Sequence, residues 1–213
     1  MKRLLSLLII SLVTFQSFSQ VDQKAKAVLD KVSEKTRNYP SINATFEFIM
    51  QNDAAGLKES NEGSLILQKD KYKLMLSGIE IYSDGKTQWT YMKDAGEVNI
   101  NNAETGDEEA INPATIFTIY EKGFKNTYLG EFTNGSKKTH KVELVPSNKM
   151  EFTKLIIEID QATNQIMNAR MFGKDGNVYT IKVKTMVTTN NYPATTFTFD
   201  PKKNPGVEVI DMR

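Results

Sequence analysis

The sequence predicts a mainly β protein whose strands form one strongly curved antiparallel sheet, as a barrel or a sandwich. Apolar and polar residues alternate along many short stretches, and glycine or pairs of polar residues separate these stretches. Such alternation is typical of half-buried strands. Three separators are the dipeptides Asp84-Gly85, Asn134-Gly135 and Asp175-Gly176, which readily adopt the positive φ angles of tight hairpin turns. About a dozen short strands joined in this way indicate a single all-β domain.

The first residues are expected to be a secretory signal. A charged start at Lys2 and Arg3 precedes a mostly apolar run from Leu4 to Phe18, and Ser17-Phe18-Ser19 forms a small-x-small cleavage site. The run is short for a membrane span, which needs ~20 residues, so cleavage is favoured over a membrane anchor. The sequence therefore predicts a signal peptide at residues 1–19 and a single exported domain at residues 20–213.

The charge balance argues against a broad electrostatic attraction to nucleic acid or anionic lipid. Loss of Lys2 and Arg3 with the signal leaves 25 of the 27 basic residues against 26 acidic ones, a formal charge of −1. A nearly neutral chain has no general pull on polyanions, so we expect no nucleic-acid partner. Because the sequence contains no cysteine, it has no lipobox and no disulfide, and its stability must come from packing.

An amphipathic helix is predicted from Val21 to Lys35. Its apolar residues recur at i, i+3, i+4 and i+7, as Ala25, Val28, Leu29 and Val32. Asn38-Tyr39-Pro40 ends the helix. From Ala44 to Met50 the period changes to two, which predicts a half-buried strand.

The stretch from Asp53 to Glu62 is polar and contains Gly56, so we expect a long loop there. Further strands are predicted at residues 64–67, 72–76, 79–83, 87–92, 98–100, 127–132, 141–145, 154–160, 166–172, 178–187 and 195–199.

One segment departs from the β pattern. Asn112 and Pro113 form a helix start, and Lys122-Gly123 forms a matching stop. A helix of roughly ten residues is marginal alone in water, so packing must hold it. Its apolar side is formed by Ile116, Phe117, Ile119 and Tyr120.

Catalytic chemistry is poorly supplied in this sequence. His140 is the only histidine, and there is no nucleophile elbow, phosphate loop or zinc-type pair of histidines. His140 alternates with Val142 and Leu144, so we interpret it as a hydrogen-bonded strand residue. We therefore predict no enzyme activity, no catalytic residue, no metal and no cofactor. The acidic residues that could bind a hard cation are more typical of a solvated loop: Glu104, Asp107, Glu108 and Glu109.

The apolar side chains are more informative. Trp89 and Tyr91 lie two residues apart in a predicted strand, so they should share one face and form a large apolar wall. Flexible or flat apolar side chains of this kind could line an adaptable cavity, although a filled core is the favoured alternative from the residues alone. The candidate cavity residues are Phe46, Phe48, Met50, Leu65, Leu67, Tyr72, Leu74, Trp89, Tyr91 and Met171.

Two segments resemble a known family. Ser83-Asp84-Gly85-Lys86-Thr87-Gln88-Trp89-Thr90-Tyr91 is similar to the SDGKTxWxY segment of the LolA family of periplasmic outer-membrane lipoprotein carriers. Phe197-Thr198-Phe199-Asp200 followed by Gly206-Val207-Glu208-Val209-Ile210-Asp211 resembles the FxF…GV-x-V-x-D ending of that family. The resemblance extends over essentially the whole chain after the signal.

This resemblance implies a half-open barrel: a single curved, unclosed antiparallel sheet with an N-terminal helix and a short helical lid at residues 113–122. It implies a periplasmic chaperone that is not an enzyme and whose cavity binds the acyl chains of lipoproteins. The implied partners are acylated lipoproteins, an inner-membrane ABC exporter and, as a further candidate, an outer-membrane receptor. We expect a monomer. The resemblance also reverses the preference for a filled core.

One departure from the family concerns the lid. Where the family has an arginine that hydrogen-bonds the lid, this chain has Lys69, which lacks the planar five-donor fork of arginine. Lys69 is thus the candidate for holding the lid, in a weaker or different way. The missing arginine motivates an alternative, in which the same fold carries another lipid or a hydrophobic small molecule. A third possibility, a hydrolase with paired carboxylates, has no residue pair to support it.

Overall fold

The computed structural model describes residues 22–103 and 123–213. The predicted signal peptide, the acidic residues from Glu104 to Glu109 and the predicted lid lie outside these ranges. The elements are, in chain order, α1 (Gln23–Arg37), β1 (Ile42–Asn52), β2 (Leu57–Gln68), β3 (Lys71–Leu76), β4 (Ile79–Ser83), β5 (Thr87–Met92), β6 (Glu97–Asn102), β7 (Phe124–Asn134), β8 (Lys137–Pro146), β9 (Phe152–Asp160), β10 (Ile166–Gly173), β11 (Val178–Val187), the short 3-10 helices η3 (Ala194–Phe197) and η4 (Pro201–Lys203), and β12 (Glu208–Asp211).

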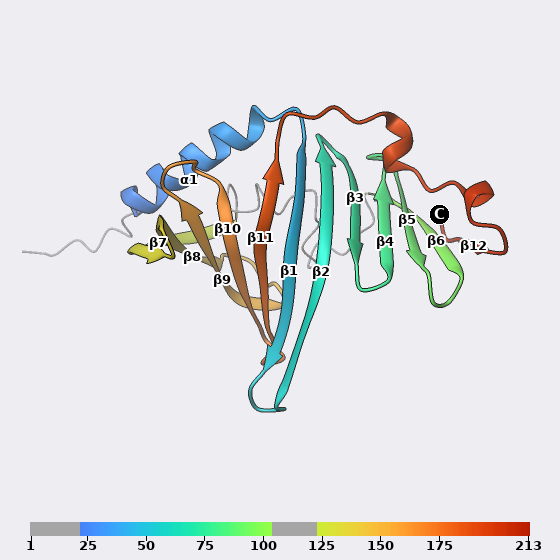
Figure 1. The fold of residues 1–213 in the computed structure, drawn as a ribbon. Helices are drawn as coiled ribbons and strands as arrows, with labels where there is room; N and C mark the ends of the chain where they lie inside the picture. Colours follow the sequence, from blue (N-terminus) through green and yellow to red (C-terminus); the bar gives the residue numbers. More distant parts are fainter. Residues whose placement is uncertain (1–21, 104–122) are drawn as a thin grey trace, which may run out of the picture.

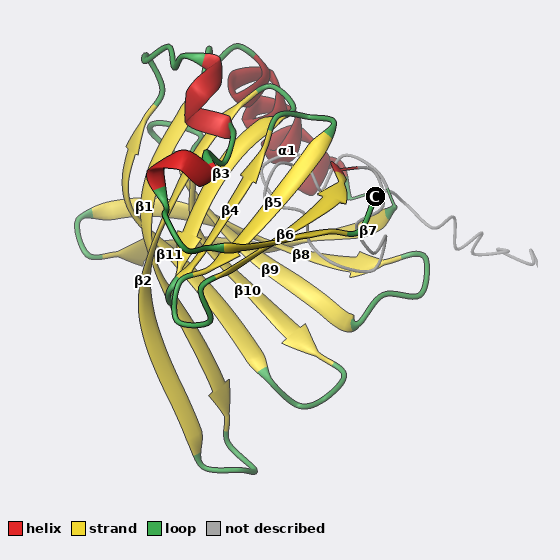
Figure 2. Cartoon of the chain, turned by 90° about the vertical axis from the view of Figure 1, so that its right-hand side faces the viewer, coloured by secondary structure: helices red, strands yellow, loops and turns green. Residues whose placement is uncertain are grey.

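The strands of the described residues form one twelve-stranded sheet in the order β12-β6-β5-β4-β3-β2-β1-β11-β10-β9-β8-β7 (Figure 1). β1 therefore lies at the centre, between β2 and β11. β7 and β12 are the two edges, so the curved sheet remains unclosed (Figure 2). The prediction of a mainly β fold with one unclosed sheet is confirmed. One pair departs from antiparallel pairing, because β12 runs parallel to β6.

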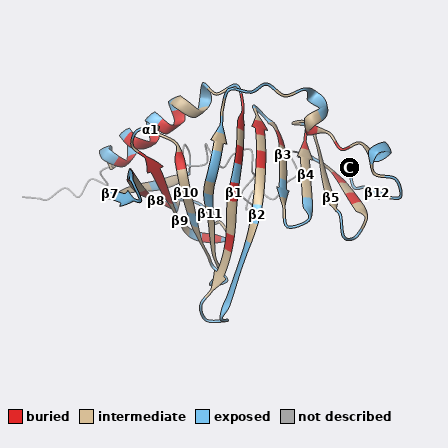
Figure 3. Ribbon diagram, viewed as in Figure 1, coloured by how far each residue is buried: buried red, intermediate tan, exposed pale blue. Residues whose placement is uncertain are grey.

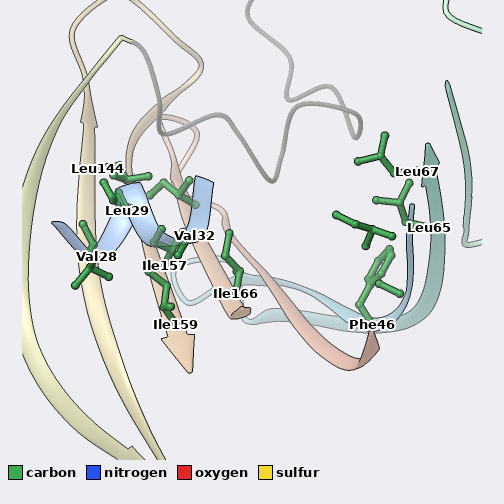
Figure 4. Close-up of a cluster of buried hydrophobic side chains, with 14 of the residues drawn as sticks. Val28, Leu29, Val32, Phe46, Leu65, Leu67, Leu144, Ile157, Ile159 and Ile166 are labelled. Carbon is green, nitrogen blue, oxygen red and sulfur yellow. The ribbon is translucent and has the colours of Figure 1, made fainter. Parts of the chain in front are cut away.

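Helix α1 packs across one end of the concave face. Ala25, Val28, Leu29 and Val32 are all buried, which confirms the predicted apolar stripe. They belong to one apolar cluster with residues of β8, β9 and β10, including Leu144, Ile157 and Ile166 (Figure 4). The helix is thus held by the sheet, as a short helix must be.

The predicted loop at residues 53–62 is wrong. The turn is only Asp53 to Gly56, and β2 begins at Leu57. β2 extends beyond β3, which pairs with it only from Gly63 to Gln68, so much of the first half of β2 is exposed (Figures 1 and 3). Polar side chains are favourable on both faces of this first half of β2, because no other part of the described chain packs on either face. Two polar pairs join this part of β2 to other strands: Ser60 donates to Glu47 of β1 at 2.8 Å, and Lys184 of β11 lies 2.5 Å from Glu62.

The predicted strand at residues 195–199 is also wrong. The chain forms η3 there, and Phe197 is fully buried while Phe199 is nearly so. The two phenylalanines alternate with threonines because one side of this segment packs on the outer face of the sheet. Such packing produces the same period-two pattern as a strand without any ladder of hydrogen bonds. None of the helices in the described ranges is long and apolar enough to cross a membrane.

Candidate functional site

An apolar cavity of about 240 Å³ lies on the concave face of the sheet. Six strands from both halves of the chain contribute to it, so its walls depend on the whole curved sheet. The lining residues are Ala44, Phe46 and Phe48 of β1, Leu65 of β2, Leu74 and Leu76 of β3, Leu155 and Ile157 of β9, Ile166, Ala169 and Met171 of β10, and Tyr179, Ile181 and Val183 of β11.

Strand register brings these side chains to one face. Residues directly opposite each other in an antiparallel pair share a face of the sheet. Phe46 lies opposite Gly63 of β2 and Val183 of β11. Leu65 in turn lies opposite Leu74 of β3. In Figure 4, Phe46, Leu65 and Leu67 lie together at one side, and the α1 residues with Leu144, Ile157 and Ile159 lie at the other.

Among the described residues that form the cavity wall, the one polar side-chain atom is the hydroxyl of Tyr179. This hydroxyl donates to Asp175 at 3.3 Å and accepts a hydrogen bond from Asn177 at 3.1 Å. The Tyr179 ring stacks on Phe48 with centroids 6.1 Å apart. Hydrogen bonds from the backbone N–H and side chain of Asn177 also hold the pKa of Asp175 below its usual value. Because the hydroxyl is already paired, the wall suits a ligand portion without hydrogen-bonding groups.

The structure brings five of the ten predicted cavity residues together at this wall: Phe46, Phe48, Leu65, Leu74 and Met171. Leu67 and Tyr72 are opposite partners on β2 and β3 and are buried in the adjoining core. The Tyr72 hydroxyl donates to Gln88 at 2.7 Å, and burial raises the pKa of Tyr72 to about 12. Met50 lies farther along β1, toward the hairpin turn, and is not part of the wall.

The prediction that Trp89 and Tyr91 line this cavity is wrong. The two do share a face, but Trp89 lies opposite Tyr82 and Tyr91 opposite Glu80. The cavity-facing Leu74 lies opposite Ile81, the residue between these two partners on β4. Trp89 and Tyr91 therefore point to the outer face, where the Tyr91 ring packs on Phe199 with centroids 5.0 Å apart.

Several wall residues were not predicted, chiefly those of the second half of the chain. Their strands were predicted, and the alternation of Tyr179, Ile181 and Val183 is visible in the sequence. In β9 the run Leu155-Ile156-Ile157 is apolar throughout, so its pattern does not distinguish the two faces. Predicting these wall residues would also have required knowing which strands pair with each other, and alternation within one strand does not give that information.

The predicted lid residues Ile116, Phe117, Ile119 and Tyr120 lie outside the described residues. Lys69 lies in the turn between β2 and β3, exposed, with a left-handed φ of 58°. Its part in holding a lid stays a prediction.

His140 is hydrogen-bonded on its strand. Its Nδ1 lies 2.8 Å from the Tyr128 hydroxyl, and burial lowers its pKa. Within residues 22–103 and 123–213, no three His, Cys, Asp or Glu side chains gather in a way that could hold a metal ion.

An unclosed curved sheet with an apolar cavity on its concave face defines this chain as a half-open barrel protein. The model of the family described as outer membrane lipoprotein carrier protein LolA matches residues 15–173, and the chain belongs to this family. The resemblance stated from the sequence is thereby confirmed. The comparison with curated protein sequences finds no match.

Solved structures share the fold at low sequence identity. An uncharacterised conserved protein from Thermus thermophilus is 13% identical with a TM-score of 0.57, and the match covers 89% of this chain and 99% of that one. The lipoprotein LppX of Mycobacterium tuberculosis is 10% identical with a TM-score of 0.53, over 81% of this chain and 100% of its own. At this identity the similarity concerns the fold alone.

Proposed function

We propose that this protein is a periplasmic carrier that binds the acyl chains of lipoproteins in the concave-face cavity. The observation that carries the proposal is the composition of the wall: an apolar surface whose one hydroxyl is already hydrogen-bonded, in a chain of the LolA family. Its partners would be acylated lipoproteins, an inner-membrane ABC exporter that supplies them and an outer-membrane receptor that accepts them.

The physical requirement for such a carrier is shielding. Each buried methylene contributes ~0.8 kcal/mol, so acyl chains do not cross water unprotected. A cavity built from side chains of both halves of an unclosed sheet can shield a chain and release it without a chemical step. The sequence accordingly offers no nucleotide-binding motif.

A charge placed in the cavity tests the proposal. Ile181 lines the cavity, and its neighbour Thr180 points to the opposite face of β11. We expect Ile181→Glu to weaken binding of a fluorescent long-chain fatty acid at least about tenfold, because an unpaired carboxylate in an apolar wall is costly and draws water in. Thr180→Glu adds the same charge to the outer face and should leave the affinity within about twofold. Equal affinities of the two variants, both folded by circular dichroism, would rule out the cavity as the binding site.

A second candidate is a carrier of a single-chain lipid or another hydrophobic small molecule. It is favoured by the volume of about 240 Å³. An engineered apolar cavity of about 150 Å³ holds one benzene molecule, so the observed volume corresponds to roughly ten carbon atoms. Extraction of the bound material distinguishes the candidates, because a lipoprotein brings a polypeptide with it and a free lipid does not.

A further inference from the structure

The ring of Phe46 lies against the backbone of the neighbouring strand at Gly63. The two residues are direct partners across β1 and β2. A Cβ atom placed on Gly63 would lie 2.4 Å from both Cε2 and Cζ of the Phe46 ring, and 3.2 Å from Cδ1 of Leu76. Carbon atoms in contact are normally about 3.5–4.0 Å apart. The ring thus occupies the space that any side chain at position 63 would need.

Backbone conformation does not explain this glycine. Gly56 and Gly78 lie in turns with φ angles of 65° and 80°, whereas Gly63 is in the middle of β2 and is not among the residues with positive φ. Glycine inside a strand normally weakens it, because it has no side chain to pack. An aromatic ring from the next strand compensates by covering the bare backbone. What Gly63 provides is therefore room for the Phe46 ring.

A displaced ring would have to enter the cavity. The residues that surround Phe46 on this face also line the cavity: Ala44 and Phe48 along β1, Leu65 and Leu76 on β2 and β3, and Val183 on β11. Protein interiors are close-packed and yield little to an extra group. Lifting the ring off Gly63 would therefore fill part of the cavity.

We infer that Gly63 determines the length of alkyl chain that the cavity accepts, because it gives the Phe46 ring a place against the sheet. The inference rests on the proposed function for its ligand, an acyl chain. The volume of about 240 Å³ corresponds to roughly ten carbon atoms, and moving the ring inward would shorten the chain that fits. A chain longer than the remaining space would leave methylenes in water.

The test compares Gly63→Ala with the wild type by xenon binding and by binding of an eight-carbon and a fourteen-carbon fatty acid. Xenon occupies empty apolar cavities, so it reports the volume independently of lipid binding. Each methylene left outside reduces affinity by a factor of about four. We expect the fourteen-carbon acid to bind at least about tenfold more weakly to Gly63→Ala, because losing the space of two carbons already costs that much. Xenon should also bind more weakly. The eight-carbon acid is shorter than the roughly ten carbons that the cavity holds, so it should lose less than about threefold.

Two further variants test whether the displaced Phe46 ring causes the loss of binding. Ser64→Ala changes the next residue of β2, on the opposite face, and should bind as the wild type does. Adding Phe46→Ala to Gly63→Ala removes the displaced ring and should restore xenon binding and the fourteen-carbon acid to near the wild-type values. Unchanged binding in Gly63→Ala, or no restoration in the double variant, would overturn the inference.

The remaining outcomes are also decisive. If the wild type binds xenon but no fatty acid, the proposed function fails, while the xenon comparison still tests whether Gly63 sets the volume. If Gly63→Ala does not fold, Phe46→Ala alone enlarges the cavity and should shift the preference toward an eighteen-carbon chain over a fourteen-carbon one. An unchanged preference there would contradict the inference.

Discussion

The carboxylate of Asp22 links the start of helix α1 to the edge strand β7. Its Oδ1 accepts hydrogen bonds from the backbone N–H groups of Lys24 and Ala25, both at 3.0 Å. Its Oδ2 accepts from the N–H of Tyr128 in β7 at 2.6 Å. The bonds from Ala25 and Tyr128 are the main reasons why the pKa of Asp22 lies below its usual value of 3.8.

Replacing Asp22 by alanine should destabilise the fold by about 1–2 kcal/mol at pH 7, because it removes an N-cap and a link to β7. Since the folded pKa is lowered, this stabilisation is present above about pH 4 and is lost as the pH falls through the folded pKa. The difference between wild type and Asp22→Ala in urea unfolding should therefore shrink on acidification. Asp30→Ala, on the exposed side of α1, is the control and should cost less than about 0.5 kcal/mol. A pH-independent difference would show that the carboxylate's charge is not involved.

The position of Trp89 shows how far the placement of a single residue can be predicted from sequence. Alternation correctly placed Trp89 and Tyr91 on one face of their strand. Alternation does not tell whether that shared face is the concave or the outer face of the sheet. Here it is the outer face, which the C-terminal segment covers. Phe46 and Phe48 lie on the face of the central strand β1 that meets the concave cavity.

The C-terminal segment that contains η3 and Phe199 covers part of the outer face of the sheet. Phe197 is fully buried and lies edge-on to Tyr192, with ring centroids 6.5 Å apart. Phe199 contacts the rings of Tyr82 and Tyr91. These contacts build a second apolar cluster, separated from the cavity by the sheet itself.

Truncating Phe197 should therefore affect stability without affecting binding. We expect Phe197→Ala to lower the free energy of unfolding by about 3–5 kcal/mol, the usual cost of removing a buried aromatic ring. Thr195→Ala, at an exposed position of η3, should change it by less than about 0.5 kcal/mol. Affinity for a fluorescent fatty acid, measured on the folded protein, should stay within about twofold in both variants. A large loss of affinity in folded Phe197→Ala would mean that the two faces are coupled.

Element boundaries were predicted best where turns are explicit. The predicted strands at residues 79–83, 87–92 and 178–187 coincide with β4, β5 and β11, because glycine-containing turns or polar pairs bound them. β2 was predicted too short because its first half lies beyond the end of β3 and carries polar residues on both faces. η3 was taken for a strand because one-sided packing imitates alternation.

At the scale of the whole molecule, the sheet separates two apolar clusters with different packing. The outer one is filled by the C-terminal segment, and the concave one retains a cavity between strands that are far apart in sequence. The fold class could be predicted from alternation and turns. The cavity could be predicted only in part, because its second wall arises from the pairing of β1 with β11, a contact between distant segments that local pattern does not encode.

The most direct test of the central claim is native mass spectrometry of the protein purified from its own cells, followed by organic extraction. The account predicts a bound mass that matches an acylated lipoprotein and disappears in Ile181→Glu but not in Thr180→Glu. A bound lipid without polypeptide would favour the second candidate. A protein that carries nothing from its cells and also fails to bind fatty acids when purified would contradict the assignment of the cavity as an acyl-chain site.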